Sequence, residues 1–259
     1  MENKFKRSIE AGRHPLGVIS QLCSANAIEC LGRTGFDFVV IDNEHSAVDA
    51  ETSTEYVRAA LLTGLTPMAR VRGVDRAAIL KLLDIGIQGV VVPCVSSVED
   101  AKALISYAKF YPLGERGYCP TRKDGWGFAS PTSDGMLANM AHFNRETLLI
   151  LQCETAGALE HIEEIAALDG VDGIFVGPFD LSIAMGIPGQ FADPRFQAAL
   201  QRVRKACHEN DKFCLSFATS EETVLKGYAD GYDAMVYEID AVHFISALKA
   251  RVESVKNKL

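Results

Sequence analysis

The chain has 259 residues, of which 48% are hydrophobic, and this is enough apolar material for the core of one large α/β domain. Its net charge of -8 and its scattered lysines and arginines argue against nucleic acid or an anionic membrane as a partner. The charged N-terminal stretch lacks an apolar signal region, and no apolar run approaches the length of a membrane span, so we expect a cytoplasmic protein.

The chain alternates between helical and strand-like segments. Its strands are continuous apolar runs, which favours a parallel sheet covered by helices. The predicted elements are helix 4–12, strand 16–22, helix 25–34, strand 38–42, helix 50–63, strand 66–71, helix 76–85, strand 89–93, helix 98–110, strand 148–153, a helix before strand 173–177, helix 194–210, strand 213–217, helix 221–229, strand 234–237 and helix 241–258.

Eight strands with helices between them predict an α/β fold of the (β/α)8 barrel type, a single domain over residues 1–259 with extra N-terminal and C-terminal helices. A doubly wound parallel sheet is the alternative. Glycines that follow predicted helix ends, at Gly35, Gly86 and Gly231, suit left-handed caps and carry no functional expectation.

Seven cysteines form no CxxC pair and are odd in number, which argues against a disulfide framework and against a zinc site. Cys94 and Cys153 lie at predicted strand ends with apolar neighbours. We therefore interpret the cysteines as reduced and mostly as small core residues.

Residues 111–135 interrupt the alternation with a segment rich in Gly, Pro, Ser and Thr. Loops of this length in a compact domain are usually lids, interface arms or binding loops. The cations of this segment, Arg116, Arg122 and Lys123, either face solvent or contact a substrate carboxylate.

Two carboxylates follow predicted strands, Glu154 after strand 148–153 and Asp180 after strand 173–177. The carboxyl ends of parallel strands open onto one face, so a strand-helix-strand unit brings these side chains together. The alternative is that Asp180 caps a helix beginning at Leu181 and that Glu154 is a solvated loop residue.

Gln152 and Glu154 are two residues apart, so both point into the barrel if the strand persists that far. An inward carboxylate at a barrel mouth needs a cation. Two carboxylates with waters and substrate oxygens suit Mg²⁺ or Mn²⁺, and the lack of nearby His and Cys ligands argues against zinc.

His45 follows Asp42, Asn43 and Glu44 at the end of the second strand. A lone histidine is more often structural, but at this position its neutral form can act as a base. A base needs an orienting partner, and Asp84 serves if its helix brings it toward His45.

Arg70 and Arg72 follow the third strand. A strand-end arginine either pairs with a neighbouring helix or binds a carboxylate or developing enolate oxygen, and Arg70 directly ends the apolar run. No predicted strand end carries a lysine, so a Schiff-base mechanism is disfavoured.

Together these stretches resemble the HpcH/HpaI aldolase family, the metal-dependent pyruvate aldolases typified by 4-hydroxy-2-oxoheptanedioate aldolase. The resemblance runs from Met1 to the C-terminal helix and rests on MENKFKRSIEAGR, GFDFVVIDNEH, LLDIGIQGVVVP, QCET and GVDGIFVGPFDLSIAMG.

The resemblance implies an enzyme that reversibly cleaves a 4-hydroxy-2-oxo acid to pyruvate and an aldehyde through a metal-bound pyruvate enolate. It implies Mg²⁺ or Mn²⁺, with Co²⁺ possible, and a homo-oligomer, a hexamer, that exchanges C-terminal helices. Its site residues fall on the metal ligands Glu154 and Asp180, the base His45 with its partner Asp84, the substrate arginine Arg70 and the pocket residue Gln152.

Departures from the family pattern lie around the aldehyde pocket, at Ile19, Phe179 and Glu238. We expect Phe179 to shrink the substrate pocket and Glu238 to disfavour an anionic acceptor, so the resemblance implies the pyruvate chemistry and does not identify the aldehyde. The alternatives are a related enolate-using enzyme (an oxaloacetate decarboxylase, a citrate-forming enzyme or a CoA-thioester lyase) and a non-catalytic metabolite-binding barrel.

Overall fold

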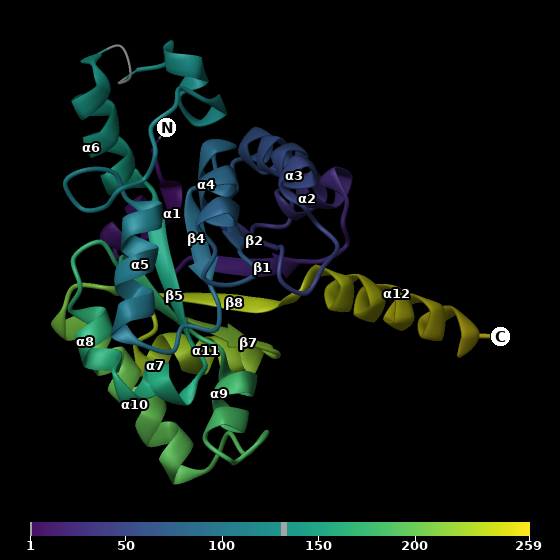
Figure 1. The fold of residues 1–259 in the computed structure, drawn as a ribbon. Helices are drawn as coiled ribbons and strands as arrows, with labels where there is room; N and C mark the ends of the chain where they lie inside the picture. The colour runs from purple at the N-terminus through teal and green to yellow at the C-terminus, as the bar shows by residue number, and fades with distance from the viewer. Residues whose placement is uncertain (1, 131–133) are drawn as a thin grey trace.

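Eight parallel strands close into a barrel in the order of the sequence in this computed structural model, which describes residues 2–130 and 134–259 (Figure 1). The predicted barrel is confirmed and the doubly wound alternative is wrong. The strands are β1 (Leu16–Ser20), β2 (Phe38–Asp42), β3 (Thr66–Arg70), β4 (Gly89–Val92), β5 (Leu148–Cys153), β6 (Gly173–Val176), β7 (Phe213–Ala218) and β8 (Ala234–Ile239).

Helices surround the barrel, and each strand is followed in the chain by at least one helix. They are α1 (Lys4–Glu10), α2 (Ala25–Leu31), α3 (Ala50–Thr63), α4 (Arg76–Asp84), α5 (Val98–Ala108), the 3-10 helix η1 (Arg122–Gly127), α6 (Met136–Glu146), α7 (Ala156–Glu160), α8 (Ile162–Ala166), α9 (Pro178–Ala184), α10 (Pro194–Glu209), α11 (Glu221–Asp230) and α12 (Asp240–Lys256).

The predicted elements agree with these bounds to within a few residues at each end, because helix and strand ends are weakly specified by pattern alone. The segment predicted as one long loop contains η1, and α6 follows it. Residues 131–133 of that segment lie outside the described part. The predicted glycine caps are confirmed, since Gly35, Gly86 and Gly231 all have positive φ.

Two apolar layers hold the barrel together. The inner layer fills the barrel with alternate strand residues such as Val40, Met68 and Ile150, and the outer layer packs the other strand faces against the helices. Most strand residues are therefore buried on both faces of the sheet, although the end of β8 is only half-buried, and this burial explains the continuous apolar runs.

Helix α1 closes the amino-terminal end of the barrel. Phe5 is 1% exposed, and its ring packs edge to face against Phe38 at a centroid distance of 5.0 Å. Its backbone N–H donates to the Thr66 hydroxyl at the start of β3. With this end covered, the carboxyl-terminal mouth is the end available for chemistry.

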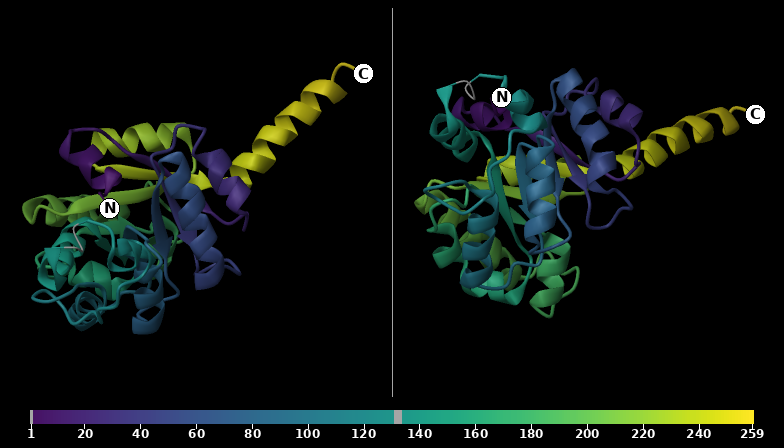
Figure 2. Two further views of the ribbon diagram at one scale, coloured as in Figure 1. Left: turned by 90° about the horizontal axis from the view of Figure 1, so that it is seen from above. Right: turned by 45° about the horizontal axis from the view of Figure 1, so that its top comes forward.

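The final helix α12 projects from the body of the barrel in all views (Figure 2). It is anchored at its first residue, Asp240, which is buried and accepts hydrogen bonds from the Ser20 hydroxyl at 2.7 Å and the Gln21 N–H at 2.8 Å. Beyond this anchor α12 exposes apolar side chains, among them Phe244, Ile245, Leu248, Val252 and Val255.

The seven thiols are free, but only Cys153, Cys207 and Cys214 are buried. The prediction that the cysteines are mostly core residues is therefore wrong, and Cys94 is exposed because it follows β4 at the open mouth. Across residues 2–130 and 134–259, no helix has the length and apolar character needed to span a membrane.

Candidate active site at the barrel mouth

A cavity of about 340 Å³ opens at the carboxyl ends of the strands, where TIM-barrel enzymes carry their sites. It brings together five of the predicted residues, from β3, β5, α9 and the loop after β2. These five are His45, Arg70, Gln152, Phe179 and Asp180.

Asp42 and Arg70 form a buried pair in the floor of this mouth. The Arg70 guanidinium donates to both carboxylate oxygens of Asp42, from Nε at 3.0 Å and from Nη2 at 2.8 Å. Burial alone raises the pKa of Asp42, but Arg70 outweighs it and holds this pKa below the usual range. The fork geometry fixes the arginine in one orientation.

Sequence reasoning assigned no role to Asp42. The sequence did contain a sign of this pair, because Asp42 and Arg70 are the last residues of the neighbouring strands β2 and β3 and are register partners. Once adjacent parallel strands are assumed, a carboxylate and a guanidinium at matching ends predict this pair. Gln21, which also donates to Asp42 at 2.7 Å, is a further missed contact.

The Arg70 side chain retains capacity for a ligand. Within residues 2–130 and 134–259, its hydrogen bonds engage Nε and Nη2, and no hydrogen bond engages Nη1. Arg70 lines the cavity, and its side chain is 10% exposed. It can therefore present one fixed N–H edge to an oxyanion while Asp42 holds the other.

His45 lies at the rim of the cavity, with 62% of its side chain exposed. Its backbone N–H donates to Asp42, and its Nε2 lies 3.7 Å from Glu44 Oε2. Glu44 also lies 3.2 Å from Arg70 Nε. The ring is thus accessible to a substrate or a water molecule, as a base requires.

Glu154 is a buried carboxylate that is 6% exposed. Its Oε1 accepts the Cys94 backbone N–H at 2.7 Å, and its Oε2 accepts a hydrogen bond from Gln152 Nε2. The predicted common direction of Gln152 and Glu154 is confirmed by that contact. The alternative that Glu154 is a solvated loop residue is wrong.

Like charges surround Glu154. Burial raises its pKa most, and the carboxylates of Asp180 and Glu44 raise it further, although the Cys94 N–H and Arg70 oppose them. The Asp180 carboxylate is therefore close enough to Glu154 to raise its pKa by electrostatic repulsion. The predicted approach of the two strand-end carboxylates is supported by this coupling.

Asp180 lies in the first turn of α9, whose N-cap is Gly177, and no side chain caps this helix. The alternative that Asp180 is an N-cap is wrong, because α9 begins at Pro178. Asp180 instead is exposed and lines the cavity. Its carboxylate interacts electrostatically with the buried Glu154.

The donor set at the mouth offers oxygen atoms to a divalent cation. Gly177 leaves a cradle, because a Cβ there would lie 2.8 Å from Glu154 Oε2 and 3.0 Å from Gln152 Nε2. The Gln152 Oε1 atom is buried without a hydrogen-bond partner in the described part of the chain. No cluster of three or more His, Cys, Asp or Glu side chains forms a metal site there, so protein groups supply an incomplete oxygen shell.

Asp84 does not lie near His45. It is the last residue of α4, which begins after β3 and ends before β4, so Asp84 lies at the amino-terminal end of the barrel. Its carboxylate instead accepts from Arg116 Nη2 at 2.8 Å and lies 3.5 Å from Lys123 Nζ. In the described part of the chain, the predicted contact between Asp84 and His45 does not form.

The cations of the segment 111–135 gather at the end of α4. Arg116 and Lys123 pair with Asp84, and Arg122 Nη1 donates to the Ile85 carbonyl at 2.9 Å. Cations are favoured at a helix C-terminus, where unpaired carbonyls carry partial negative charge. The expectation that Arg116 and Lys123 face solvent is wrong, because both are buried. They pair with Asp84 and are not among the residues that line the mouth cavity.

Residues that depart from the family pattern also line the mouth. Ile19, Phe179 and Glu238 are all in the wall of the same cavity. Phe179 is 46% exposed, and Glu238 has a positive φ of 60° at the end of β8. The departures therefore occupy the space in which a second substrate would bind.

Comparison with known proteins agrees with this site. The sequence profile of the family described as HpcH/HpaI aldolase/citrate lyase matches residues 16–247. A hydroxypyruvate/pyruvate aldolase of Sagittula stellata is 33% identical over 96% of this chain and 96% of its own length. A 4-hydroxy-2-oxo-heptane-1,7-dioate aldolase of Klebsiella pneumoniae subsp. pneumoniae is 34% identical over 80% of this chain and 77% of its own.

The fold comparison gives the same result. The crystal structure of a citrate synthase, SbnG, superposes with a TM-score of 0.87 at 27% identity, covering 98% of this chain and 97% of the other. The profile match spans most of the barrel, and the first relative covers nearly the whole chain. The chain belongs to the HpcH/HpaI aldolase/citrate lyase family and is a lyase of the pyruvate aldolase type.

Proposed function

We propose that this protein is a divalent-metal-dependent aldolase that reversibly cleaves a 4-hydroxy-2-oxo acid to pyruvate and an aldehyde. The observation that carries the proposal is the grouping at one mouth of Glu154, Asp180, Arg70 and His45. A carboxylate pair, a fixed guanidinium and an exposed imidazole supply the groups that enolate chemistry needs.

The reaction balances with these groups. In cleavage, His45, directly or through water, accepts the proton of the 4-hydroxyl, the bond between C3 and C4 breaks, and the electron pair of that bond enters the pyruvate enolate. C3 of the enolate then takes up one proton, which gives pyruvate and balances the proton lost from the hydroxyl. Condensation is the reverse, in which C3 attacks the aldehyde carbon and the new alkoxide takes up one proton. Arg70, held by Asp42, directs its free N–H edge at the developing oxyanion.

We assign the cation to Glu154 and Asp180, with water and substrate oxygens completing the shell. When bound, Mg²⁺ or Mn²⁺ supplies Lewis-acid stabilisation of negative charge on the keto oxygen. The repulsion that raises the pKa of Glu154 supports this assignment, because a cation relieves it. Co²⁺ fits the same oxygen-rich donor set.

Exchange of the pyruvate methyl protons in deuterated buffer tests the proposal without knowledge of the aldehyde. We expect exchange with Mg²⁺ or Mn²⁺, and a loss of about 100-fold or more with EDTA or in Glu154→Gln. An exposed glutamate in a surface helix, Glu29→Gln, is the matched control. Exchange that persists at the full rate after chelation would overturn the metal-dependent mechanism.

A citrate-forming activity is the second candidate, and the similarity to the citrate synthase structure favours it. Both reactions proceed through an enolate, that of pyruvate in aldol condensation and that of acetyl-CoA in citrate formation, and they also differ in the electrophile. Citrate formation from oxaloacetate and acetyl-CoA, compared with aldol condensation of pyruvate with a panel of aldehydes, separates the two. We expect condensation to dominate, since Glu238 in the wall disfavours an anionic electrophile.

We also propose that the chain forms a homo-oligomer, a hexamer by family resemblance, through α12. The apolar side chains at 245, 248, 252 and 255 recur at intervals of three and four residues and form one stripe along α12. Exposure of such a stripe on a projecting helix favours burial against a second copy of the chain.

A further inference from the structure

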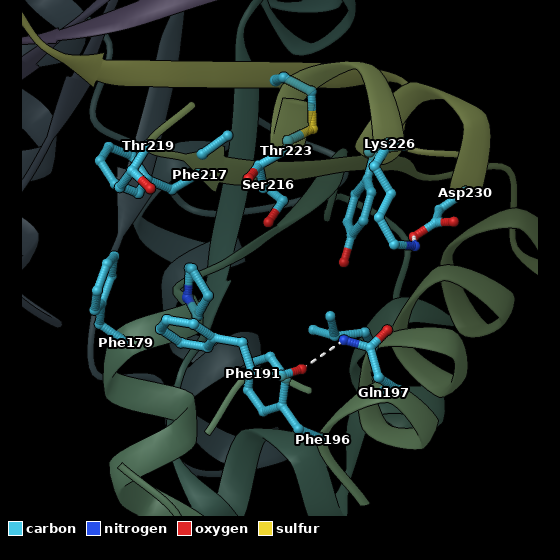
Figure 3. Close-up of a pocket in the computed structure, with 16 residues that line it drawn as sticks. Phe179, Phe191, Phe196, Gln197, Ser216, Phe217, Thr219, Thr223, Lys226 and Asp230 are labelled. Carbon is cyan, nitrogen blue, oxygen red and sulfur yellow. Dashed lines mark hydrogen bonds and ion pairs between the residues drawn. The ribbon is translucent and has the colours of Figure 1, made fainter. Parts of the chain in front are cut away.

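A second cavity lies beside the catalytic mouth, between α10, α11 and the end of β7 (Figure 3). Its volume is about 190 Å³. Its wall is largely aromatic and aliphatic, with Phe179, Phe191, Phe196, Leu200, Phe217 and Met235. An apolar cavity of about 150 Å³ in a protein interior is large enough to bind benzene, so this one admits an aromatic ring.

The two cavities share part of one wall. Pro178, Phe179, Phe217 and Thr219 line both. The Phe179 ring packs edge to face against Phe191 and Phe217, at centroid distances of 5.2 and 6.1 Å. Because Phe179 is 46% exposed and rotamer changes of exposed side chains are fast, a ligand can displace this partition from the catalytic side.

The wall also contains an unsatisfied polar group. Tyr232 is 4% exposed, and its buried hydroxyl makes no hydrogen bond of good geometry in residues 2–130 and 134–259, although the Arg204 and Ser216 side chains lie close enough to oppose the rise in its pKa that burial causes. Arg204 stacks over its ring at 5.0 Å. The Ser216 hydroxyl points into the same space in Figure 3. A buried hydroxyl without a partner costs about 1–3 kcal/mol, which a ligand with a polar atom recovers.

The two charged side chains of the described lining, Lys226 and Asp230, form an ion pair. Lys226 pairs with Asp230 at 2.6 Å, and Figure 3 shows this pair at one side of the cavity. Gln197 is engaged through its amide nitrogen with the Phe191 carbonyl at 2.7 Å. Arg204, which stacks on Tyr232, is not among the lining residues, so the described lining offers no unpaired cation for a carboxylate and suits an uncharged group.

We propose that this cavity receives the uncharged aromatic tail of the acceptor aldehyde, with a hydroxyl or carbonyl of that tail hydrogen-bonded to Tyr232 and Ser216. The inference rests on the proposed function, because the tail extends from the aldehyde carbon at which the bond to pyruvate forms. It names the substrate class as aryl-substituted aliphatic aldehydes. Phe179 then acts as the partition that the tail displaces.

The first test fills the cavity from its far side. Leu200→Phe adds a ring to the α10 wall, whereas Leu225→Phe makes the same change at an exposed α11 position outside the wall. Condensation with pyruvate is measured for 3-phenylpropanal and acetaldehyde. We expect Leu200→Phe to lower the ratio of kcat/KM for the long aldehyde to that for the short one by about tenfold or more.

The same ratio stays within about twofold of the wild-type value in Leu225→Phe. An unchanged ratio in Leu200→Phe, or an equal loss for both aldehydes, would overturn the proposal. Tyr232→Phe provides a second variant that removes one unpartnered atom and so keeps the fold. We expect it to abolish a preference of about fivefold for 3-(4-hydroxyphenyl)propanal over 3-phenylpropanal, and no such preference in the wild type contradicts the polar contact.

A binding measurement separates failure of this inference from failure of the proposed function. The unreactive alcohol 3-phenylpropanol is titrated into wild type and Leu200→Phe, and its contacts are followed by ligand-observed NMR. Binding that Leu200→Phe weakens, in a protein without metal-dependent pyruvate exchange, would refute the aldolase and keep the cavity as an aryl site. Exchange with no binding that depends on Leu200 would refute the cavity and keep the aldolase.

Discussion

At the scale of the residue, the site depends on electrostatic interactions between its charged side chains. Asp42 holds Arg70 in one orientation, and Glu154 is buried beside like charges whose repulsion a bound cation relieves. His45 differs from both because it is exposed and not locked into a buried pair. A group placed in this way can approach a hydroxyl that arrives with the substrate, so we assign it the step that involves that hydroxyl.

His45→Ala should therefore separate two reactions of the same enolate. Aldol cleavage requires removal of the 4-hydroxyl proton, whereas oxaloacetate decarboxylation reaches the enolate by loss of carbon dioxide. We expect cleavage to fall by about 10²–10⁴-fold and decarboxylation to fall far less. Steady-state rates of both reactions at saturating metal check this.

His161→Ala serves as the matched control, because His161 follows α7 and pairs with the surface residue Glu164. Both of its rates should equal those of the wild type. Equal losses of cleavage and decarboxylation in His45→Ala would show that His45 acts in binding or in enolate formation and not on the hydroxyl proton.

At the scale of the element, α1 is held at the bottom of the barrel by a polar clamp to Glu146 at the end of α6. The Asn3 N–H donates to Glu146 Oε2 at 3.0 Å, and Arg7 Nη2 donates to Oε1 at 2.8 Å. Asn3 Nδ2 also donates to the Gln88 and Glu146 carbonyls. The clamp seats Phe5 in the barrel, so polar contacts far from the mouth support the inner core.

Glu146→Gln tests the clamp through its pH dependence. Burial raises the pKa of Glu146, but Asn3, Arg145 and Arg7 outweigh it and lower this pKa below its ordinary value of 4.5. The carboxylate therefore stabilises the fold fully above about pH 4.5, and this contribution is lost as pH falls through the lower folded-state pKa. We expect Glu146→Gln to cost about 1–3 kcal/mol at pH 7.

Urea unfolding at a series of pH values from 7 downward measures this difference. The free energy gap between wild type and Glu146→Gln should narrow below about pH 4.5 as the wild-type carboxylate becomes protonated. Glu29→Gln, at an exposed position on α2, should show no gap at any pH. A gap for Glu146→Gln that is constant with pH would mean that packing, and not charge, holds α1.

At the scale of the whole molecule, the barrel is complete in one chain and α12 is not. The barrel closes on itself without help from a partner, with β1 paired to β8. Helix α12 leaves it with only Asp240 buried and an apolar stripe exposed. An exposed stripe of this length is unfavourable for an isolated chain in water, which is why we expect a second copy to cover it.

Ile245→Asp should weaken that assembly, because it places a charge in the apolar stripe of the proposed contact. Ile245 is 62% exposed in the single chain, so the change leaves the barrel intact. Size-exclusion chromatography with light scattering across protein concentrations should show a smaller species than in the wild type. Burying an unpaired carboxylate costs several kcal/mol, or roughly 100-fold or more in association.

Ser254→Asp adds the same charge on the opposite side of α12 and is the matched control. Its oligomeric state should equal that of the wild type. If both variants behave as the wild type does, or if the wild type is a monomer at micromolar concentration, α12 is not the interface.

The sequence by itself determined the barrel and the strand-end residues of the site. The apolar runs mark where each strand ends, and the closure of a parallel barrel places all those ends at one mouth. Arg70, Gln152, Glu154 and Asp180 could therefore be named without coordinates. The same reasoning applies to the helices, because each helix runs back from the carboxyl-terminal mouth to the amino-terminal end of the barrel. Asp84, at the end of α4, is therefore placed on the opposite face from His45.

Only the tertiary structure decided which side chains meet across elements. The Asp42 and Arg70 pair, the attachment of Arg116 to Asp84, and the cavity behind Phe179 each join residues distant in the chain, and local patterns carry no information on such contacts. Each depends on the angle at which loops and helices pack onto the barrel. For that reason the donor chemistry could be predicted from strand ends, whereas the acceptor specificity depends on the packing of α9, α10 and α11.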